Sequence, residues 1–128
     1  MNKYITIFGT ICIAIVLILT NPDGAKHSVA VKGILTKEFN KAMTDELQKS
    51  KNNYQQVNAG IGLFLGSTLI DKIVDGYIDC ENFYLFSLTK INYEGSDRTI
   101  GFGILGKVYI SDKLKENTSK LFNQPEDK

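Results

Sequence analysis

The residues that first suggest chemistry are three glycines that match the dinucleotide-binding fingerprint G-x-G-x-x-G: Gly101, Gly103 and Gly106. Lys107 follows, so the stretch also comes close to a phosphate-binding P-loop. Both motifs need a strand, a glycine-rich turn and then a helix whose N-terminus faces the phosphate. Here the strand pattern continues, and Val108 stands where a P-loop needs Ser or Thr. We predict no nucleotide site and no cofactor. We expect the glycines to make room for aromatic neighbours such as Tyr84 or Phe86, or to permit a bulge.

His27 is the only histidine, and the sequence around it indicates no partner for a catalytic triad or a metal site. We expect a solvated histidine close to a membrane surface. Four acidic residues form a cluster: Asp71, Asp75, Asp79 and Glu81. The first two are spaced to share a helix face, which suggests Ca²⁺ or Mg²⁺, but the Asp-x-Asp-x-Asp-Gly loop pattern is missing. We therefore predict no metal site, no catalytic residues and a protein that is not an enzyme.

The two cysteines lie in different parts of the chain, Cys12 in an apolar N-terminal segment and Cys80 in the polar remainder. A disulfide needs both Cα atoms within about 7 Å, so we predict no bridge within the chain. Cys80 is expected to be a buried apolar residue on a strand. A bridge between two chains is the alternative.

An uncharged segment runs from Tyr4 to Thr20 and is closed by Asn21-Pro22. As a helix, its seventeen residues extend roughly 25 Å, close to a bilayer core of about 30 Å. A cleaved signal peptide shares the basic start and apolar core, but Ile18 and Asp23 occupy positions where the peptidase wants small residues. We predict an uncleaved signal-anchor over residues 1–21 that crosses the membrane once. A cleaved signal and a buried globular helix are the alternatives.

Fourteen acidic residues and fourteen of the fifteen Lys and Arg follow the apolar segment, so the rest of the chain is formally neutral. Nucleic acid binding needs a basic surplus, and we predict no such partner. We expect one small domain at 22–123 and a polar tail at 124–128. A signal-like start places this domain outside the cytoplasm, although the lysines after the segment slightly favour the opposite orientation.

Apolar residues at helical spacing predict a first domain helix with Asn21 as its N-cap. The polar stretch 49–58 predicts a loop, and the apolar stretch 59–74 predicts a buried helix. Within this helix, Gly62 and Gly66 have the spacing that allows two helices to approach closely. The spacing is either incidental or lets the helix press onto a sheet. Contact with the membrane or with a second chain is the alternative.

Alternating residues predict two antiparallel strands at 83–93 and 99–110, joined by a turn at 94–97. The second strand would have one strongly apolar face: Ile100, Phe102, Ile104, Val108 and Ile110. A lone hairpin is marginally stable, so we expect a third short strand at 77–80 or pairing between chains. The predicted fold class is α+β. It has an N-terminal transmembrane helix, two helices packed on an antiparallel hairpin or small sheet, and a short C-terminal helix that begins at Ser111-Asp112.

Several segments together resemble an uncharacterised bacterial family called domain of unknown function 4359. These are the anchor closed by Thr20-Asn21-Pro22, residues 66–75 (GSTLIDKIVD), 82–87 (NFYLFS) and 101–108 (GFGILGKV). The resemblance covers most of residues 21–110. It implies a small membrane-anchored domain containing the hairpin, and it implies no activity, because that family carries no established catalytic residues.

We expect a non-enzymatic interaction or structural domain whose partner is a protein or a second copy of the chain. The candidate surface residues are Tyr84, Phe86 and Tyr109 at the hairpin edge, with Gly62 and Gly66 on the helix. For the three aromatic residues a place in the core is the first expectation. The alternative function is a small-molecule or lipid-binding module with a pocket between helix 59–74 and the sheet.

Overall fold

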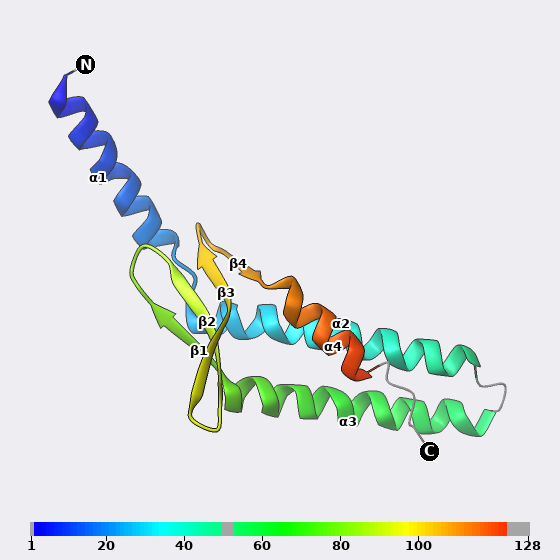
Figure 1. Cartoon of the computed structure of the whole chain (residues 1–128). Coiled ribbons are helices and arrows are strands. Elements are labelled where there is room, and N and C mark those ends of the chain that lie inside the picture. Colours follow the sequence, from blue (N-terminus) through cyan, green and yellow to red (C-terminus); the bar gives the residue numbers. More distant parts are fainter. Residues whose placement is uncertain (1, 50–52, 123–128) are drawn as a thin grey trace. The chain divides into compact units, whose positions relative to one another are not determined.

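A computed structural model describes residues 2–49 and 53–122 of the chain. In these residues four helices and four strands follow one another: α1 (Lys3–Thr20), α2 (Gly24–Lys49), α3 (Asn53–Tyr77), β1 (Ile78–Asn82), β2 (Ser87–Tyr93), β3 (Ser96–Ile104), β4 (Lys107–Ile110) and α4 (Asp112–Phe122) (Figure 1). The predicted α+β class is confirmed, as are the apolar N-terminal helix, the third strand and the short C-terminal helix. The predicted tail at 124–128 lies outside the described residues.

The chain divides into two compact units. The first contains residues 1–30 and 78–110, which include α1, the start of α2 and the whole sheet. The second contains residues 31–77 and 111–128, which include the rest of α2, α3 and α4. The single domain over 22–123 stays a prediction.

The helix α1 has no buried residue, and in the described part of the chain it alone is long and apolar enough to cross a membrane. It ends at Thr20 because Pro22 excludes the helical region for the residue before it. Asn21 accordingly has an extended backbone (φ −62°, ψ 126°), and its N–H donates to the carbonyl of Ile18.

The first helix of the predicted domain starts two residues later than an N-cap at Asn21 would place it, since α2 begins at Gly24. Asn21 is not its N-cap, since this residue closes α1 instead. Asp23 accepts a hydrogen bond from the Lys26 N–H (3.0 Å) and thereby caps α2, which begins at Gly24.

The four strands lie in the order β1-β2-β3-β4, each antiparallel to the next. Two-residue turns join β2 to β3 at Glu94-Gly95 and β3 to β4 at Leu105-Gly106. All four turn residues have positive φ, between 51° and 77°, as type I′ hairpins require. The second turn divides the predicted strand 99–110, so that part of the prediction is wrong.

The turn at Leu105-Gly106 also changes which residues share a face of the sheet. Phe102 pairs with Tyr109, and Gly103 pairs with Val108. Directly paired residues point to the same face of the sheet, so Val108 lies on the face opposite to Phe102. The uninterrupted strand had placed both residues on one face.

The β2–β3 register shifts between Thr89 and Lys90, beside Gly101, as a bulge would produce. The expectation that the glycines make room for Tyr84 or Phe86 is wrong, since Gly101 faces Ile110 and Gly103 faces His27.

Residues 83–86 form a loop between β1 and β2, so the predicted strand 83–93 begins only at Ser87. The pair Asn82–Ser87 closes this loop, and within it the Phe83 N–H donates to the Phe86 carbonyl (2.9 Å). Tyr84 takes a left-handed backbone with φ 66°. The chain must reverse here because β1 and β2 are adjacent antiparallel strands.

In the second unit Gly62 and Gly66 face the helix α2, and not the sheet that was expected from the sequence. Gly66 is buried against the ring of Phe39, and the Met43 methyl lies 3.0 Å from the position that a Cβ on Gly62 would take. The glycines therefore accommodate α2. Most of the predicted loop 49–58 is helix, because α3 already begins at Asn53; residues 50–52 lie outside the described part.

Candidate functional site

The first turns of α2 and the strand β2 enclose a buried polar cluster. His27 is 0% exposed, and so are Ser87 and Thr89. The prediction of a solvated histidine is wrong. Alternate strand residues point to one side, so both hydroxyls face the helix. Gly103 leaves room for the ring, since a Cβ there would lie 2.7 Å from Ser87 Oγ and 2.8 Å from His27 Nε2.

The hydrogen bonds of this cluster determine the tautomer of His27. Ser87 Oγ donates its proton to the Pro22 carbonyl (3.0 Å). Ser87 Oγ must then accept from His27 Nε2–H (2.7 Å), because a hydroxyl has only one proton. Nδ1 is left as an acceptor for the Thr89 hydroxyl (2.5 Å). The imidazole is neutral, and both of its nitrogens are satisfied.

Burial controls the ionisation of the cluster. It lowers the pKa of His27, and the nearby carboxylate of Asp23 raises this pKa only in part. Burial also raises the pKa of the half-buried Cys80 thiol, and the charges of Asp79 and Asp23 raise it further. Both shifts favour neutral side chains. The thiol is thus a poor nucleophile near neutral pH.

The serine and histidine of this cluster do not form a nucleophile and base. Ser87 gives its proton to Pro22 and not to His27, which is the reverse of the arrangement that activates a serine. Both side chains are also closed off from solvent. The cluster is therefore structural: it fastens the segment after α1 to β2.

A second set of hydrogen bonds fastens the same segment beside the β1–β2 loop. Asn21 Nδ2 donates to Asn82 Oδ1 (2.8 Å) and to the Phe86 carbonyl (3.2 Å). Asn82 Oδ1 also accepts the Tyr84 N–H (2.7 Å). The C-terminal end of α1 is thus bonded directly to this end of the sheet.

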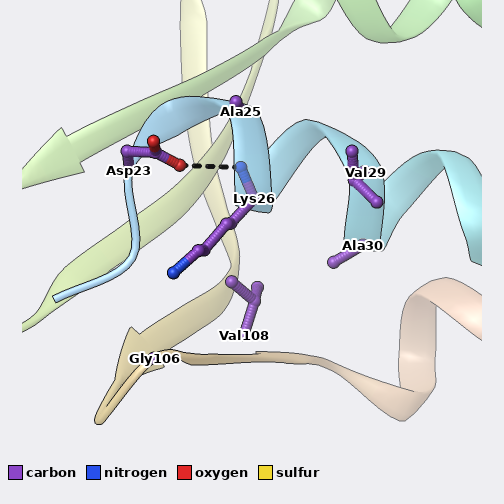
Figure 2. A pocket seen from close by; sticks show the side chains of 7 residues that line it. All are labelled: Asp23, Ala25, Lys26, Val29, Ala30, Gly106 and Val108. Atoms are coloured by element: carbon purple, nitrogen blue, oxygen red, sulfur yellow. Dashed lines mark hydrogen bonds between the residues drawn. The ribbon is translucent and has the colours of Figure 1, made fainter. Parts of the chain in front are cut away.

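A shallow pocket lies beside the first turns of α2. It has a volume of about 380 Å³ and is lined by Asp23, Ala25, Lys26, Val29, Ala30, Gly106 and Val108 (Figure 2). The Asp23 carboxylate is engaged in capping α2, as the dashed line in Figure 2 shows. The Lys26 ammonium is then the only other ionisable side-chain group of the lining, so the pocket offers no acid–base pair.

Two of the acidic residues that the sequence singled out lie in separate ion pairs. Asp71 forms an ion pair with Lys32 in the second unit, whereas Glu81 forms one with Lys90 in the sheet. Among the described residues, no three His, Cys, Asp or Glu side chains lie together as metal ligands would.

The three aromatic candidates were expected first in the core, and they lie outside it. Tyr84 is 75% exposed, and Phe86 stacks on Phe83 in the same loop with ring centroids 5.0 Å apart. Tyr109 is on the edge strand β4 and stacks on Phe102 at 5.2 Å. Their role as an interaction surface stays a prediction.

Sequence reasoning missed the cluster of His27, Ser87 and Thr89. A signal was present, because Ser and Thr alternate on one face of β2 while Gly101 and Gly103 recur at the same spacing in β3. Small and hydroxyl residues on facing positions indicate that a large polar side chain fills the space between them and another element.

Together these features define a class: a small antiparallel sheet bonded to the C-terminal end of one apolar helix that is long enough to cross a membrane. No protein-family model, curated protein or solved structure matches the chain. The resemblance to domain of unknown function 4359 stays a prediction.

We expect the stability of the sheet unit to fall in mild acid. The unfolded chain takes up a proton at His27 near its ordinary pKa of 6.5, while burial holds the folded pKa below this value. The contribution of His27 is therefore complete above about pH 6.5 and is lost as the pH falls toward the lowered pKa. Thermal unfolding of the detergent-solubilised protein between about pH 7 and pH 5 measures this slope. This pH range lies above the pKa values of ordinary carboxylates.

The matched control is His27→Gln, which has no titrating ring. Its melting temperature should be lower at neutral pH and nearly constant over the same range. An equal slope in both proteins would contradict the assignment of this pH dependence to His27.

Proposed function

We propose that the protein is a single-pass, signal-anchored membrane protein of a bacterial envelope whose domain lies outside the cytoplasm. On this proposal the domain acts by binding a protein partner or a second copy of itself, and not by catalysis. The apolar helix α1 supports the anchor. The resemblance to domain of unknown function 4359 agrees with this arrangement and carries no activity.

The observation that carries the proposal is an exposed apolar stripe on α3, the face available for a partner. The stripe consists of residues four apart: Ile61, Leu65, Leu69 and Ile73. Each of these side chains is between 45% and 59% exposed, although residues with this spacing ordinarily lie on the packed side of a helix. The packed side of α3 is formed by others: Gly66, Ile70 and Val74. An apolar stripe of this length is typical of an interaction surface.

Lysine substitutions in the stripe should weaken association. We expect Leu65→Lys together with Leu69→Lys to lower the affinity by at least about a hundredfold, because each leucine buried at the interface contributes roughly 1.5–3 kcal/mol. Cross-linking and sedimentation of the full chain in mild detergent measure the loss. Ser67→Lys is the control for Leu65→Lys alone, since each adds one charge and Ser67 is an exposed position of α3 outside the stripe.

Intact mass of the same preparation tests the anchor, and protease added to spheroplasts tests the orientation. A full-length mass, an accessible domain and a stoichiometric protein or second copy would support the proposal. A mass lacking about the first twenty residues would show a cleaved signal. A co-purifying lipid or small molecule in place of protein would favour the alternative, a ligand-binding module whose pocket between residues 59–74 and the sheet stays a prediction.

A further inference from the structure

We propose that two apolar turns of the sheet enter the membrane interface beside α1. These are the loop Phe83–Phe86 between β1 and β2, and the turn Leu105-Gly106 between β3 and β4. The inference rests on the proposed function in taking α1 as a membrane span. It adds a second and a third contact between the protein and the lipid.

The loop between β1 and β2 exposes four large apolar side chains in sequence. Phe83, Leu85 and Phe86 are each 39–42% exposed, and Tyr84 is 75% exposed. The loop is well defined by its closing hydrogen bond and by the stacked rings of Phe83 and Phe86. Contiguous exposed groups of this size mark an interaction surface. Aromatic residues with one polar tip, such as tyrosine, are enriched where hydrocarbon meets water.

The hydrogen bonds of Asn21 determine the depth of this loop. Asn21 follows the last residue of α1, and its side chain bonds to both Asn82 and the Phe86 carbonyl. The loop therefore lies at the level where α1 leaves the hydrocarbon. This is the depth at which aromatic side chains are stable in a membrane.

The turn Leu105-Gly106 reaches further along α1. The position of a Cβ on Gly106 lies 3.7 Å from the Thr20 carbonyl oxygen, at the end of the helix. From there the Leu105 side chain reaches back to an apolar hollow of about 290 Å³, which it lines together with Cys12, Ile13, Val16 and Leu17.

Helix geometry converts these contacts into a depth. Cys12 and Thr20 are eight residues apart, which corresponds to about 12 Å along the helix. Leu105 thus lines a hollow whose α1 side runs from Leu17 to Cys12, about 4.5–12 Å from Thr20 and within hydrocarbon if α1 spans the bilayer. The hollow has no polar lining, so a lipid acyl chain is the occupant that its chemistry fits.

The opposite end of the sheet has the reverse character. Figure 1 shows the loop 83–86 and the turn Leu105-Gly106 at the end of the sheet nearest to α1, and the turn Glu94-Gly95 at the far end. Charged residues surround that far turn: Glu94, Asp97 and Arg98. The sheet is therefore apolar at the end next to the anchor and charged at the other end, as a domain resting on a membrane requires.

Single tryptophans test the proposal, because the chain contains none. Tyr84→Trp reports on the loop Phe83–Phe86, and Leu105→Trp reports on the turn Leu105-Gly106. Both positions are more than half exposed, so each can hold a tryptophan. Phe8→Trp in α1 reports on the anchor. Tyr93→Trp at the far end of β2 is the control, about 20 Å from Ser87. Each full-length variant is reconstituted into vesicles of phosphatidylcholine with and without bromine on the acyl chains, and its emission is compared.

We expect Tyr84→Trp and Leu105→Trp to lose emission in brominated vesicles as Phe8→Trp does, with Leu105→Trp quenched by deeper bromines, while Tyr93→Trp keeps its emission. If Phe8→Trp is quenched and both turn probes behave as Tyr93→Trp does, the anchor stands and the inserted turns are refuted. Turns covered by a second copy of the chain would give the same result and would equally refute insertion. If Phe8→Trp itself is not quenched, the membrane span and the inference built on it both fail.

Discussion

Replacing His27 by alanine should lower the free energy of unfolding by about 3–5 kcal/mol. The ring is fully buried, so its removal leaves a cavity in the sheet unit. The substitution also takes away the donor to Ser87 Oγ and the acceptor of the Thr89 hydroxyl, and each unsatisfied buried group costs about 1–3 kcal/mol. Chemical denaturation of the full chain in detergent, followed by circular dichroism, measures the change.

Thr89→Val is the milder companion, because it preserves the shape of the side chain and removes only the hydroxyl that donates to Nδ1. We expect a loss of about 1–3 kcal/mol. The double variant should be less destabilised than the sum of the two single variants, since the hydrogen bond is lost only once. A loss below about 1 kcal/mol for His27→Ala would mean that the cluster does not hold the unit together.

Gly103→Ala should cost about 2–4 kcal/mol, although it adds a single methyl group. The new Cβ would lie 2.7 Å from Ser87 Oγ, and 2.8 Å from both His27 Nε2 and Pro22 Cγ. Carbon atoms normally keep at least about 3.5 Å from such neighbours, so three buried groups must move together. Movement of Ser87 would also break its bonds to the histidine and to the carbonyl of Pro22.

The matched control is Gly33→Ala in α2, where an added Cβ meets no atom within 4 Å. This substitution should stabilise the protein by about 0.5–1 kcal/mol, because alanine is the better helix former. A loss of stability for Gly103→Ala together with a gain for Gly33→Ala would show that the close approach at Gly103 is real. A neutral Gly103→Ala would indicate that the strand and the helix can separate without loss.

The fold was predictable where the signal is local. The absence of charge from Tyr4 to Thr20 suffices for α1, since a helix satisfies its backbone within itself. Alternation predicted β2 and most of β3, and the instability of a lone hairpin predicted β1. Element boundaries were less accurate: the turn at Leu105-Gly106 carries a leucine at φ 51°, which no turn rule anticipates.

The candidate site was not predictable in the same way. His27 is 60 residues from Ser87 and 62 from Thr89 in the chain, and a single histidine looks the same whether it is solvated or enclosed. Likewise, the aromatic residues of the loop Phe83–Phe86 fit a core by composition. They are 39–75% exposed, because the loop lies beyond the last residue pair of β1 and β2, Asn82–Ser87.

The sequence by itself determined the apolar helix, the neutral remainder and the antiparallel strands, because these follow from charge and from short-range periodicity. Only the tertiary structure decided that His27 fastens the anchor segment to β2, that Gly103 makes room for its ring, and that the apolar turns lie beside α1. Burial depends on which distant segments meet. That meeting is a property of the packed chain and not of any one stretch of residues.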